Sequence, residues 1–353
     1  MHLLDDVDYC RMIDMQDMLK HIRSLPTQVE TAWSQVHEVD NLPTERPSDI
    51  VILGMGGSAI GGDIACSLAY GFSEIPMVVH RDYGIPRWVG SSSLVIAVSH
   101  SGNTEETLSG FEEACKRGSM LFAIASGGKL IEMAEKHGVP FYRYESEAPP
   151  RASIGYLLMP ILAVLNSTGV YKLDDEVVSN AVDCLNRLKQ SVDAEVPTED
   201  NKAKQLAVYL HGHIGLILAS HPLTAVARRW KTQINENANT ACFFEVLPEL
   251  CHNTVVGLDF PCKLSDVIRV LMLRSAFSND RNRLREEIVN RLLKHSGIKC
   301  EQVEVEVSAH PLCEALQLVM LGDFVSYYLS LLNRVNPTTI LNIDYLKLKL
   351  SQA

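Results

Sequence analysis

Short hydrophobic runs alternate with longer amphipathic stretches over residues 50–143. Each run is rich in Val, Ile, Leu or Phe, ends at polar or glycine residues, and is shorter than a typical helix. Buried parallel strands separated by helices give this pattern. Strands are expected at 50–53, 76–80, 94–98, 120–125 and 139–143, and helices at 58–70, 104–117, 129–137 and 152–167.

A second alternation of the same kind follows later in the chain. Strands are expected at 214–219, 267–273 and 301–307, and helices at 222–236, 279–296, 311–333 and, as a last amphipathic helix, 338–350. The polar stretch 187–205 contains Pro197 and suits an exposed connection between domains. Spaced apolar residues such as Met15, Met18 and Ile22 predict one or two amphipathic helices in the first forty residues.

These patterns predict an α/β protein with two doubly wound α-β-α sandwich domains, each built on a parallel sheet. The expected boundaries are an N-terminal helical extension packing on the core (1–45), a first domain carrying a ligand-binding cradle (46–170), a helix and linker (171–205), and a second domain with a C-terminal helix (206–353). A chain of 353 residues that is 46% hydrophobic can form both cores.

Charge and cysteine usage limit the partners and the compartment. The net charge of −11, with no long Lys/Arg run, gives no footprint for nucleic acid or an anionic membrane surface. Nine cysteines without a CxxC pair fit reduced thiols in the cytoplasm. Early acidic residues argue against a signal peptide, and the longest apolar run, Ile154 to Leu165, is too short to span a bilayer. We therefore expect a soluble cytoplasmic protein.

Two loops carry the candidate chemistry. Gly54-Met55-Gly56-Gly57-Ser58-Ala59 follows the strand at 50–53, and Ser99-His100-Ser101-Gly102-Asn103-Thr104 follows the strand at 94–98. Both lead into helices, whose first N–H groups are free and carry partial positive charge. Glycines let a ligand approach the backbone, and the second loop is crowded with hydroxyl groups. The two loops together predict a cradle for a phosphorylated small molecule.

Two other interpretations stay open at this point. Asn103 and Glu106 have the spacing of a capping box, so either loop alone could be ordinary helix-start chemistry. Gly54, Gly56 and Ala59 also match the dinucleotide-binding fingerprint, with Asp82 after the next strand. Asp82 is late in the chain for a ribose contact, and the fingerprint gives the hydroxyl-rich loop no role.

The Ser99–Thr104 loop resembles that of the sugar isomerase (SIS) domain superfamily, where a Ser-x-Ser-Gly-Asn-Thr loop holds a sugar phosphate. Four further segments, in the same order, are similar to the bifunctional phosphoglucose/phosphomannose isomerase family of archaea and bacteria. They are Gly54 to Gly62, Pro150 to Tyr156, Arg229 to Ala238 and Pro248 to Asn253. The resemblance extends from about residue 50 to the C-terminus and covers most of the chain.

The resemblance implies a role for individual residues. Arg151 would lie beside the reacting carbons, Glu236 would be the catalytic base, and His252 would assist ring opening. A lysine of the C-terminal helix would reach the ring oxygen, and this is Lys347 or, as an alternative, Lys349, about 200° around the helix. The phosphate would be bound by Gly56, Gly57, Ser58, Ser99, Ser101 and Thr104.

Physical chemistry supports these assignments. Moving a proton between C2 and C1 needs one base that takes it and returns it, which suits a carboxylate. The enediolate oxygen needs a fixed cation, and arginine never loses its charge. Pro149 and Pro150 place Arg151 at the first turn of its helix, where the dipole is unfavourable to a cation, so a functional reason is favoured.

The scheme needs neither a metal nor a cofactor. His211, His213 and His221 are the residues that would suggest a metal site, but they lack a carboxylate at ligand spacing. A role at the surface or at a strand end is expected for them instead.

Three departures from the family pattern adjoin the proposed site. His100 stands where tyrosine is expected, Asn239 where lysine often follows, and Cys251 where asparagine commonly precedes the histidine. The leading hypothesis is an aldose–ketose isomerase acting on glucose 6-phosphate, and on mannose 6-phosphate, to form fructose 6-phosphate. The alternatives are a catalytically impaired phosphosugar-binding regulator and, more weakly, an NAD-dependent oxidoreductase. The resemblance also implies a homodimer in which His252 reaches into the partner's site.

Overall fold

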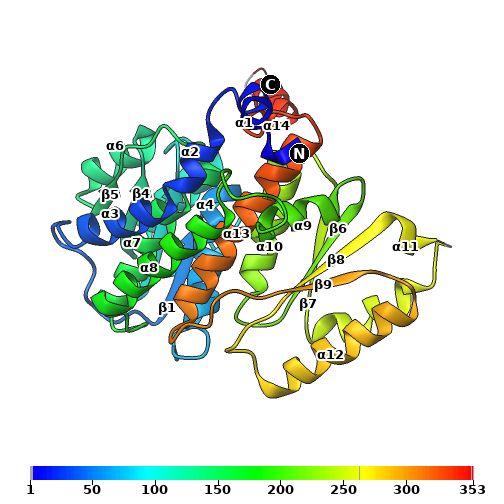
Figure 1. Ribbon diagram of the computed structural model, residues 1–353. Helices are drawn as coiled ribbons and strands as arrows, with labels where there is room; N and C mark the ends of the chain where they lie inside the picture. The colour runs from blue at the N-terminus through cyan, green and yellow to red at the C-terminus, as the bar shows by residue number, and fades with distance from the viewer. Residues whose placement is uncertain (1–2, 262, 351, 353) are drawn as a thin grey trace. The chain divides into compact units, whose positions relative to one another are not determined.

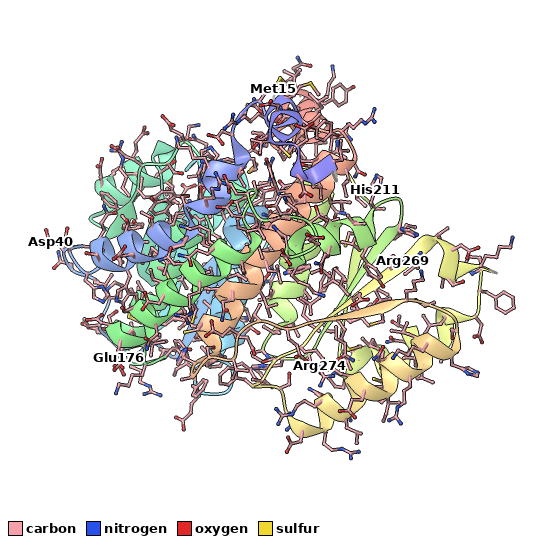
Figure 2. All side chains as sticks on the ribbon, viewed as in Figure 1. Met15, Asp40, Glu176, His211, Arg269 and Arg274 are labelled. Carbon is pink, nitrogen blue, oxygen red and sulfur yellow. The ribbon has the colours of Figure 1, made fainter. Side chains whose placement is uncertain are left out.

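The computed structural model describes residues 3–261, 263–350 and 352 (Figures 1 and 2). The chain forms two compact units. The five-stranded unit comprises Ser24–Asn186 and Ser308–Leu316, and the four-stranded unit comprises the residues up to Arg23, Arg187–Val307 and the chain from Gln317 on. Each unit holds one parallel sheet with helices, which confirms the predicted fold class. The domain boundaries predicted from the sequence stay a prediction.

The five-stranded sheet has the order β2-β1-β3-β4-β5, and all its strand pairs are parallel. Its strands lie within two residues of the predicted ones: β1 Asp49–Leu53, β2 Met77–His80, β3 Ser93–Ser99, β4 Met120–Ala125 and β5 Phe141–Arg143. β1 and β3 are neighbours, with Leu53 opposite Ala97. The loops that follow these two strands therefore begin side by side.

Both faces of this sheet are buried at its central strands β1, β3 and β4, which explains their continuous hydrophobic runs. Val51, Val95 and Phe111 belong to a core cluster between the sheet and the helices α5 and α6. On the other face α4 packs on α7 so closely that a Cβ added at Gly61 would lie 3.2 Å from the Leu157 carbonyl oxygen. The helices are α3 Leu25–Val36, α4 Gly56–Ala69, α5 Glu105–Lys116, α6 Gly128–His137, α7 Ile154–Ser167 and the first part of α8 Asp175–Val192.

The four-stranded sheet has the order β7-β6-β8-β9 and is also fully parallel (Figure 1). Its strands are β6 Ile214–Ala219, β7 Cys242–Val246, β8 Ile268–Leu273 and β9 Cys300–Val303. Its larger helices are α9 Lys202–Leu210, α10 Thr224–Ala238, α12 Asp280–His295, the greater part of α13 Pro311–Leu332, and α14 Leu341–Leu350. Strand order and connectivity repeat those of β2-β1-β3-β4 in the other sheet.

The edge strand β7 is absent from the strands predicted from the sequence. Its apolar run, residues 241–244, is short and is followed by Glu245, and a run of this length does not distinguish a strand from the end of a helix. The predicted connection 187–205 is also wrong over part of its length, because α8 continues to Val192 and α9 begins at Lys202. Only 193–201 lies outside helices, and the charged residues before it lie on the last turns of α8.

The N-terminal region forms three helices rather than one or two. They are α1 Val7–Ile13, α2 Met18–Arg23 and α3, preceded by the short helix η1 Leu3–Asp5. Met18 and Ile22 are buried as their spacing predicts, whereas Met15 is 76% exposed (Figure 2).

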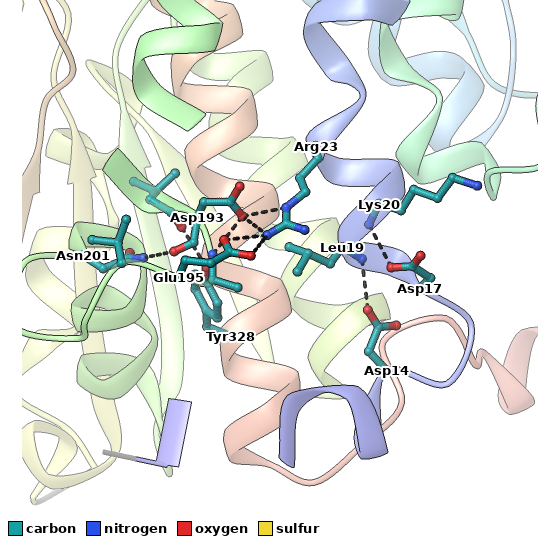
Figure 3. A network of polar contacts seen from close by, with 12 residues as sticks. Asp14, Asp17, Leu19, Lys20, Arg23, Asp193, Glu195, Asn201 and Tyr328 are labelled. Atoms are coloured by element: carbon teal, nitrogen blue, oxygen red, sulfur yellow. Dashed lines mark hydrogen bonds and ion pairs between the residues drawn. The ribbon is translucent and has the colours of Figure 1, made fainter. Parts of the chain in front are cut away.

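An ionic contact fixes α2 within the four-stranded unit (Figure 3). Arg23 Nε donates to Asp193 Oδ1 at 2.7 Å, and its Nη2 lies 2.8 Å from Glu195 Oε2. The segment that carries these two acids is held in turn, because Asn201 Nδ2 donates to the Asp193 carbonyl at 2.9 Å. Tyr328 Oη donates to the carbonyl of Val192 at 2.7 Å, which ties the end of α8 to α13.

Among the described residues, Pro311–Leu332 is long and apolar enough to cross a membrane by length and composition, but 94% of its most apolar window is buried inside the protein. A buried core helix has this composition. The helix predicted at 338–350 is α14, Leu341–Leu350; none of its residues is buried, and Tyr345 and Leu346 are 63% and 58% exposed.

The helix α10 is fixed on the second half of α13 by buried polar contacts. Arg229 Nη2 donates to both carboxylate oxygens of Asp323, at 2.9 and 2.7 Å, and Gln233 Nε2 donates to Asp323 Oδ1 at 2.7 Å. Trp230 is fully buried, and its Nε1 donates to the Leu318 carbonyl at 2.8 Å. A Cβ at Gly322 would lie 2.5 Å from that indole nitrogen. The indole can therefore not move aside without losing its hydrogen bond.

A histidine of the five-stranded unit is held neutral by its surroundings. His100 Nδ1 lies 2.8 Å from Tyr144 Oη, and the Tyr144 ring stacks on Tyr156 with 4.9 Å between centroids. Burial lowers the pKa of His100 below its usual range. The folded state therefore favours the uncharged imidazole, and protonation opposes folding.

We expect Gly322→Ala to lower the free energy of unfolding by about 1–3 kcal/mol, because the new methyl group overlaps a locked indole. Urea denaturation followed by circular dichroism measures this loss. Gly71→Ala is the control, because an added Cβ there has no atom within 4 Å. Equal midpoints for the two variants would contradict the packing argument.

Acidification should destabilise the wild type partly through His100. Its unfolded-state pKa is about 6.5 and its folded-state pKa is lower, so unfolding takes up a proton as the pH falls through this range. Stability is present above about pH 6.5 and declines below it. Urea midpoints between pH 7.5 and 5 should fall less steeply for His100→Gln. His137→Gln, at an exposed position of α6, is the control. Parallel plots of urea midpoint against pH for the wild type and both variants would refute this role of His100.

Candidate functional site

The two predicted loops meet at the ends of β1 and β3. The backbone N–H of His100 donates to Ser58 Oγ at 3.0 Å, which joins the second loop to the first turn of α4. A Cβ at Gly54 would lie 3.1 Å from the carbonyl oxygen of Val98, so the first loop approaches β3 closely at this glycine. The structure thus brings both loops into one place.

The Ser99–Thr104 loop is fixed by its own polar groups. The Oγ atoms of Ser99 and Thr104 are 2.8 Å apart, and Ser101 Oγ accepts from the Asn103 N–H at 3.2 Å. Gly102 has φ +68°, and any Cβ there would overlap the Gly127 carbonyl oxygen. The loop therefore needs glycine at 102 for both conformation and space.

Neither helix that starts at these loops is capped by a side chain. Met55 and Thr104 are the N-cap residues of α4 and α5, and neither makes a side-chain cap hydrogen bond. Asn103 does not form the expected capping box, because its Oδ1 accepts from the Lys129 N–H at 3.2 Å instead. The hydroxyl groups are thus not explained by helix capping. The two helix starts keep N–H groups for an anion.

Arg151 lies next to this pair of loops but not at the predicted place on a helix. It lies in the short 3-10 helix η2, Pro150–Ala152, and α7 begins only at Ile154. Ser153, with φ −113° and ψ 25°, interrupts the helical path. Arg151 is 3% exposed, and a Cβ at Gly57 would lie 3.2 Å from its backbone nitrogen. Its backbone therefore packs directly on the first turn of α4.

Glu236 belongs to the four-stranded unit. It lies near the end of α10, is half-buried, and faces a pocket of about 480 Å³. The other lining residues are Asn235, Asn239, Val335, Asn336, Thr339, Ile340, Leu341, Asn342 and Ile343. None of these residues is predicted as a site residue from the sequence; Asn235 lies in the segment Arg229–Ala238 that resembles the family, and Asn239 departs from the family pattern. Carboxamide and hydroxyl groups in this number could hydrogen-bond a polyhydroxylated ligand.

Asn239 has a structural reason to replace lysine. It ends α10 in the left-handed conformation, with φ 49°, which asparagine adopts more readily than most side chains. Its change from the family pattern therefore does not disturb the helix that carries Glu236.

Neither candidate lysine lines the pocket at Glu236. Lys347 and Lys349 are exposed on α14, and Lys349 Nζ lies 3.3 Å from Gln352 Oε1 and 5.7 Å from the centre of the Tyr345 ring. The assignment of a ring-oxygen lysine stays a prediction.

His252 is exposed at the end of the short helix η3, Glu249–His252, and is also outside the pocket lining. The neighbouring Cys251 is half-buried, and burial raises the pKa of its thiol, so it behaves as a small apolar residue.

No group of three His, Cys, Asp or Glu side chains able to hold a metal occurs among the described residues. His213 Nδ1 instead lies 2.8 Å from the His211 carbonyl.

Comparison with protein families matches residues 199–350 to the bacterial phospho-glucose isomerase C-terminal SIS domain. The chain is 36% identical to a bifunctional phosphoglucose/phosphomannose isomerase of Caldicellulosiruptor bescii, over 95% of this chain and 99% of that one. It is 33% identical to the protein of the same name from Thermoplasma acidophilum, over 94% and 99% of the two chains.

Solved structures share the fold. A hypothetical protein from Thermus thermophilus superposes with a TM-score of 0.75 at 17% identity, over 99% of this chain and 94% of that one. The C-terminal domain of glucosamine-fructose-6-phosphate aminotransferase from Francisella tularensis gives 0.70 at 15% identity, over 91% and 98%. The structural likeness shows the fold, and the near full-length sequence matches show that the chain belongs to the bifunctional phosphoglucose/phosphomannose isomerase family.

Proposed function

We propose that this protein is an aldose–ketose isomerase that interconverts glucose 6-phosphate, and mannose 6-phosphate, with fructose 6-phosphate. The observation that carries the proposal is the pair of uncapped helix starts at β1 and β3, joined through Ser58 and lined with hydroxyl groups. Such a cradle suits a phosphate group, and the relatives over nearly the whole chain are named for phosphosugar isomerisation.

The cradle holds the phosphate end of the substrate. Gly56 and Ser101 are exposed, whereas Ser58 and Ser99 are buried. Backbone N–H groups of Gly56, Gly57 and the turn at Thr104 add donors without adding net charge. This arrangement binds a dianion at a fixed place, so that C1 and C2 of the sugar lie at a fixed distance from it.

The reaction moves one proton between two carbons. The Glu236 carboxylate removes the proton from C2 of the open-chain aldose, and the electron pair forms the C1–C2 double bond of the enediolate. The same carboxyl group returns the proton to C1, while the hydroxyl proton on O2 is lost to O1 and the C2 carbonyl of the ketose forms. Arg151 stabilises the negative oxygen of the intermediate without exchanging a proton.

Two aldoses can share this path because their enediolates are the same. Glucose 6-phosphate and mannose 6-phosphate differ only in configuration at C2, which becomes planar in the intermediate. Rotation about the C2–C3 bond lets one base reach the C2 proton of either sugar. His252 assists ring opening by proton transfer at the sugar oxygens, with Lys347 or Lys349 near the ring oxygen.

The protein acts as a homodimer in which the partner supplies His252 to each site. His252 is exposed at the end of a short helix, in reach of another chain. A C2 dimer presents the same surface twice, so the two sites are equivalent.

Specific observations favour the isomerase over its alternatives. An impaired regulator would owe its loss of activity to His100, Asn239 and Cys251, yet each of these residues has a compatible structural environment. The dinucleotide hypothesis leaves the Ser99–Thr104 loop without a role, although this loop contacts the first turn of α4 through Ser58. Failure of the purified wild type to convert either aldose phosphate would end the proposal.

Glu236→Gln should lower kcat for fructose 6-phosphate formation by about 10²–10⁴-fold, because the amide cannot accept the C2 proton. Fructose 6-phosphate should still raise the thermal midpoint of the variant, because the phosphate cradle is unchanged. Glu301→Gln, at an exposed position of the edge strand β9, is the matched control. Unchanged turnover in Glu236→Gln would remove this residue as the base.

Donation of His252 by the partner can be tested by co-expressing two inactive variants, so that hybrid dimers form. Co-expression of Glu236→Gln with His252→Ala should restore about a quarter of wild-type activity, because half of the dimers are hybrids with one complete site out of two. Pairing Glu236→Gln with Glu236→Ala should restore none, because no dimer then carries an intact Glu236. Equal activity of the two mixtures would contradict donation of His252 by the partner.

A further inference from the structure

The carboxamide of Gln28 bridges the two backbone segments on either side of Ser153. Gln28 belongs to α3 and is 2% exposed. Its Nε2 donates to the carbonyl of Ala152 at 2.7 Å, and its Oε1 accepts from the N–H of Gly155 at 3.1 Å. The same amide nitrogen donates to Ser24 Oγ at 3.0 Å. One side chain therefore ties the helix η2 and the start of α7 to a third element.

Two glycines make this arrangement close-packed. A Cβ at Gly155 would lie 2.5 Å from the Cβ of Gln28, so only glycine lets α7 begin here. On the other side, a Cβ at Gly57 would lie 3.2 Å from the Arg151 nitrogen. The backbone of Arg151 is thus held between the first turn of α4 and the junction that Gln28 binds.

The junction needs a side chain that both donates and accepts. The break at Ser153 leaves the Ala152 carbonyl and the Gly155 N–H outside the hydrogen-bond ladder of a continuous helix. Both partners of Gln28 are buried, where an unmet polar group costs about 1–3 kcal/mol. A carboxamide satisfies both groups at once, an ionised carboxylate satisfies only the N–H, and a thioether satisfies neither.

We propose that Gln28 is a positioning residue for isomerisation, and that it acts by fixing the backbone from which Arg151 reaches the enediolate oxygen. This inference rests on the proposed function, because it assigns Arg151 to the intermediate. Gln28 is far from Arg151 in the sequence. It lies in the predicted N-terminal extension, 1–45, so the proposal gives a residue of that extension a role in the reaction.

The inference predicts a distinct kinetic effect. The side-chain hydrogen bonds of Gln28 go to Ser24, Ala152 and Gly155 and not to the cradle loops, so we expect ground-state binding of the phosphate to be preserved when Gln28 is changed. Stabilisation of the enediolate depends on the placement of the guanidinium, and a displacement of about 1 Å can cost about 10²-fold in rate. The loss should therefore appear in kcat and leave KM unchanged.

The first experiment compares Gln28→Met with Gln35→Met. Gln35 lies on the same helix α3 and is exposed, and its Oε1 accepts from Tyr142 Oη at 3.0 Å, away from the junction. Gln28→Met should lower kcat about 10–100-fold with KM within about twofold, and Gln35→Met should change neither. Binding of an aldonate phosphate with a planar carboxylate should weaken as kcat falls, whereas glucitol 6-phosphate should bind as before. Unchanged kcat in a folded Gln28→Met would overturn the inference.

A double-mutant cycle tests whether Gln28 acts through Arg151. In the background of Arg151→Met, adding Gln28→Met should cause no further loss of kcat, because the group being positioned is gone. Additive losses would show a different, general structural role for Gln28 and overturn the inference.

Gln28→Glu tests the inference without requiring that the fold accept methionine at position 28. An ionised carboxylate accepts from Gly155 but repels the Ala152 carbonyl, whereas the protonated acid has both a donor and an acceptor, like the native amide. The ratio of variant to wild-type kcat should rise as the pH is lowered. A flat ratio would overturn the inference. An active wild type with normal Gln28 variants refutes only the inference, whereas an inactive wild type refutes the proposed function itself.

Discussion

The hydrogen bond between the His100 N–H and Ser58 Oγ depends on β1 and β3 being neighbours in a parallel sheet, and the candidate phosphate site depends on that bond. Parallel strands end at the same edge, so helices that follow adjacent strands begin close together. In this chain the two helix starts are joined by a buried serine rather than by a charged pair. An anion bound between these loops would therefore meet N–H and hydroxyl donors.

The second sheet repeats the strand order but closes the equivalent place with its own residues. At the end of β6, Ser220 Oγ donates to Glu286 Oε1 at 2.7 Å and lies 2.9 Å from Ser278 Oγ. Arg274, at the end of β8 (Figure 2), forms an ion pair with Glu286 Oε2 at 3.2 Å. A buried carboxylate from α12 thus occupies the strand ends that an anion would need. The two sheets therefore share a strand order but not a site. The Glu286 carboxylate lies at the strand ends of the second sheet, where the first sheet has its candidate phosphate site.

Local patterns predicted most of the fold, because continuous apolar runs and helical spacing directly reflect burial on both faces of a sheet. The failures have physical causes. The strand β7 pairs only with β6 at a sheet edge, and its apolar run is too short to distinguish a strand from the end of the preceding helix. Arg151 was expected on a helix because two prolines favour a helix start, but the conformation of Ser153 is set by tertiary contacts such as those of Gln28. Contacts between residues distant in sequence, including the pocket residues around Glu236, have no local signature.

The acidic composition is compatible with phosphate binding, because the positive potential in the cradle comes from N–H groups close to the ligand. A chain with a net charge of −11 gains little from long-range attraction of a phosphosugar. Backbone N–H groups and hydroxyl groups act only at contact distance, so they bind the phosphate despite the net charge. The buried Arg151 is then available for the oxygen whose charge develops during the reaction. A lysine-rich cradle would hold substrate and intermediate equally well, whereas a neutral cradle with one fixed guanidinium favours the intermediate.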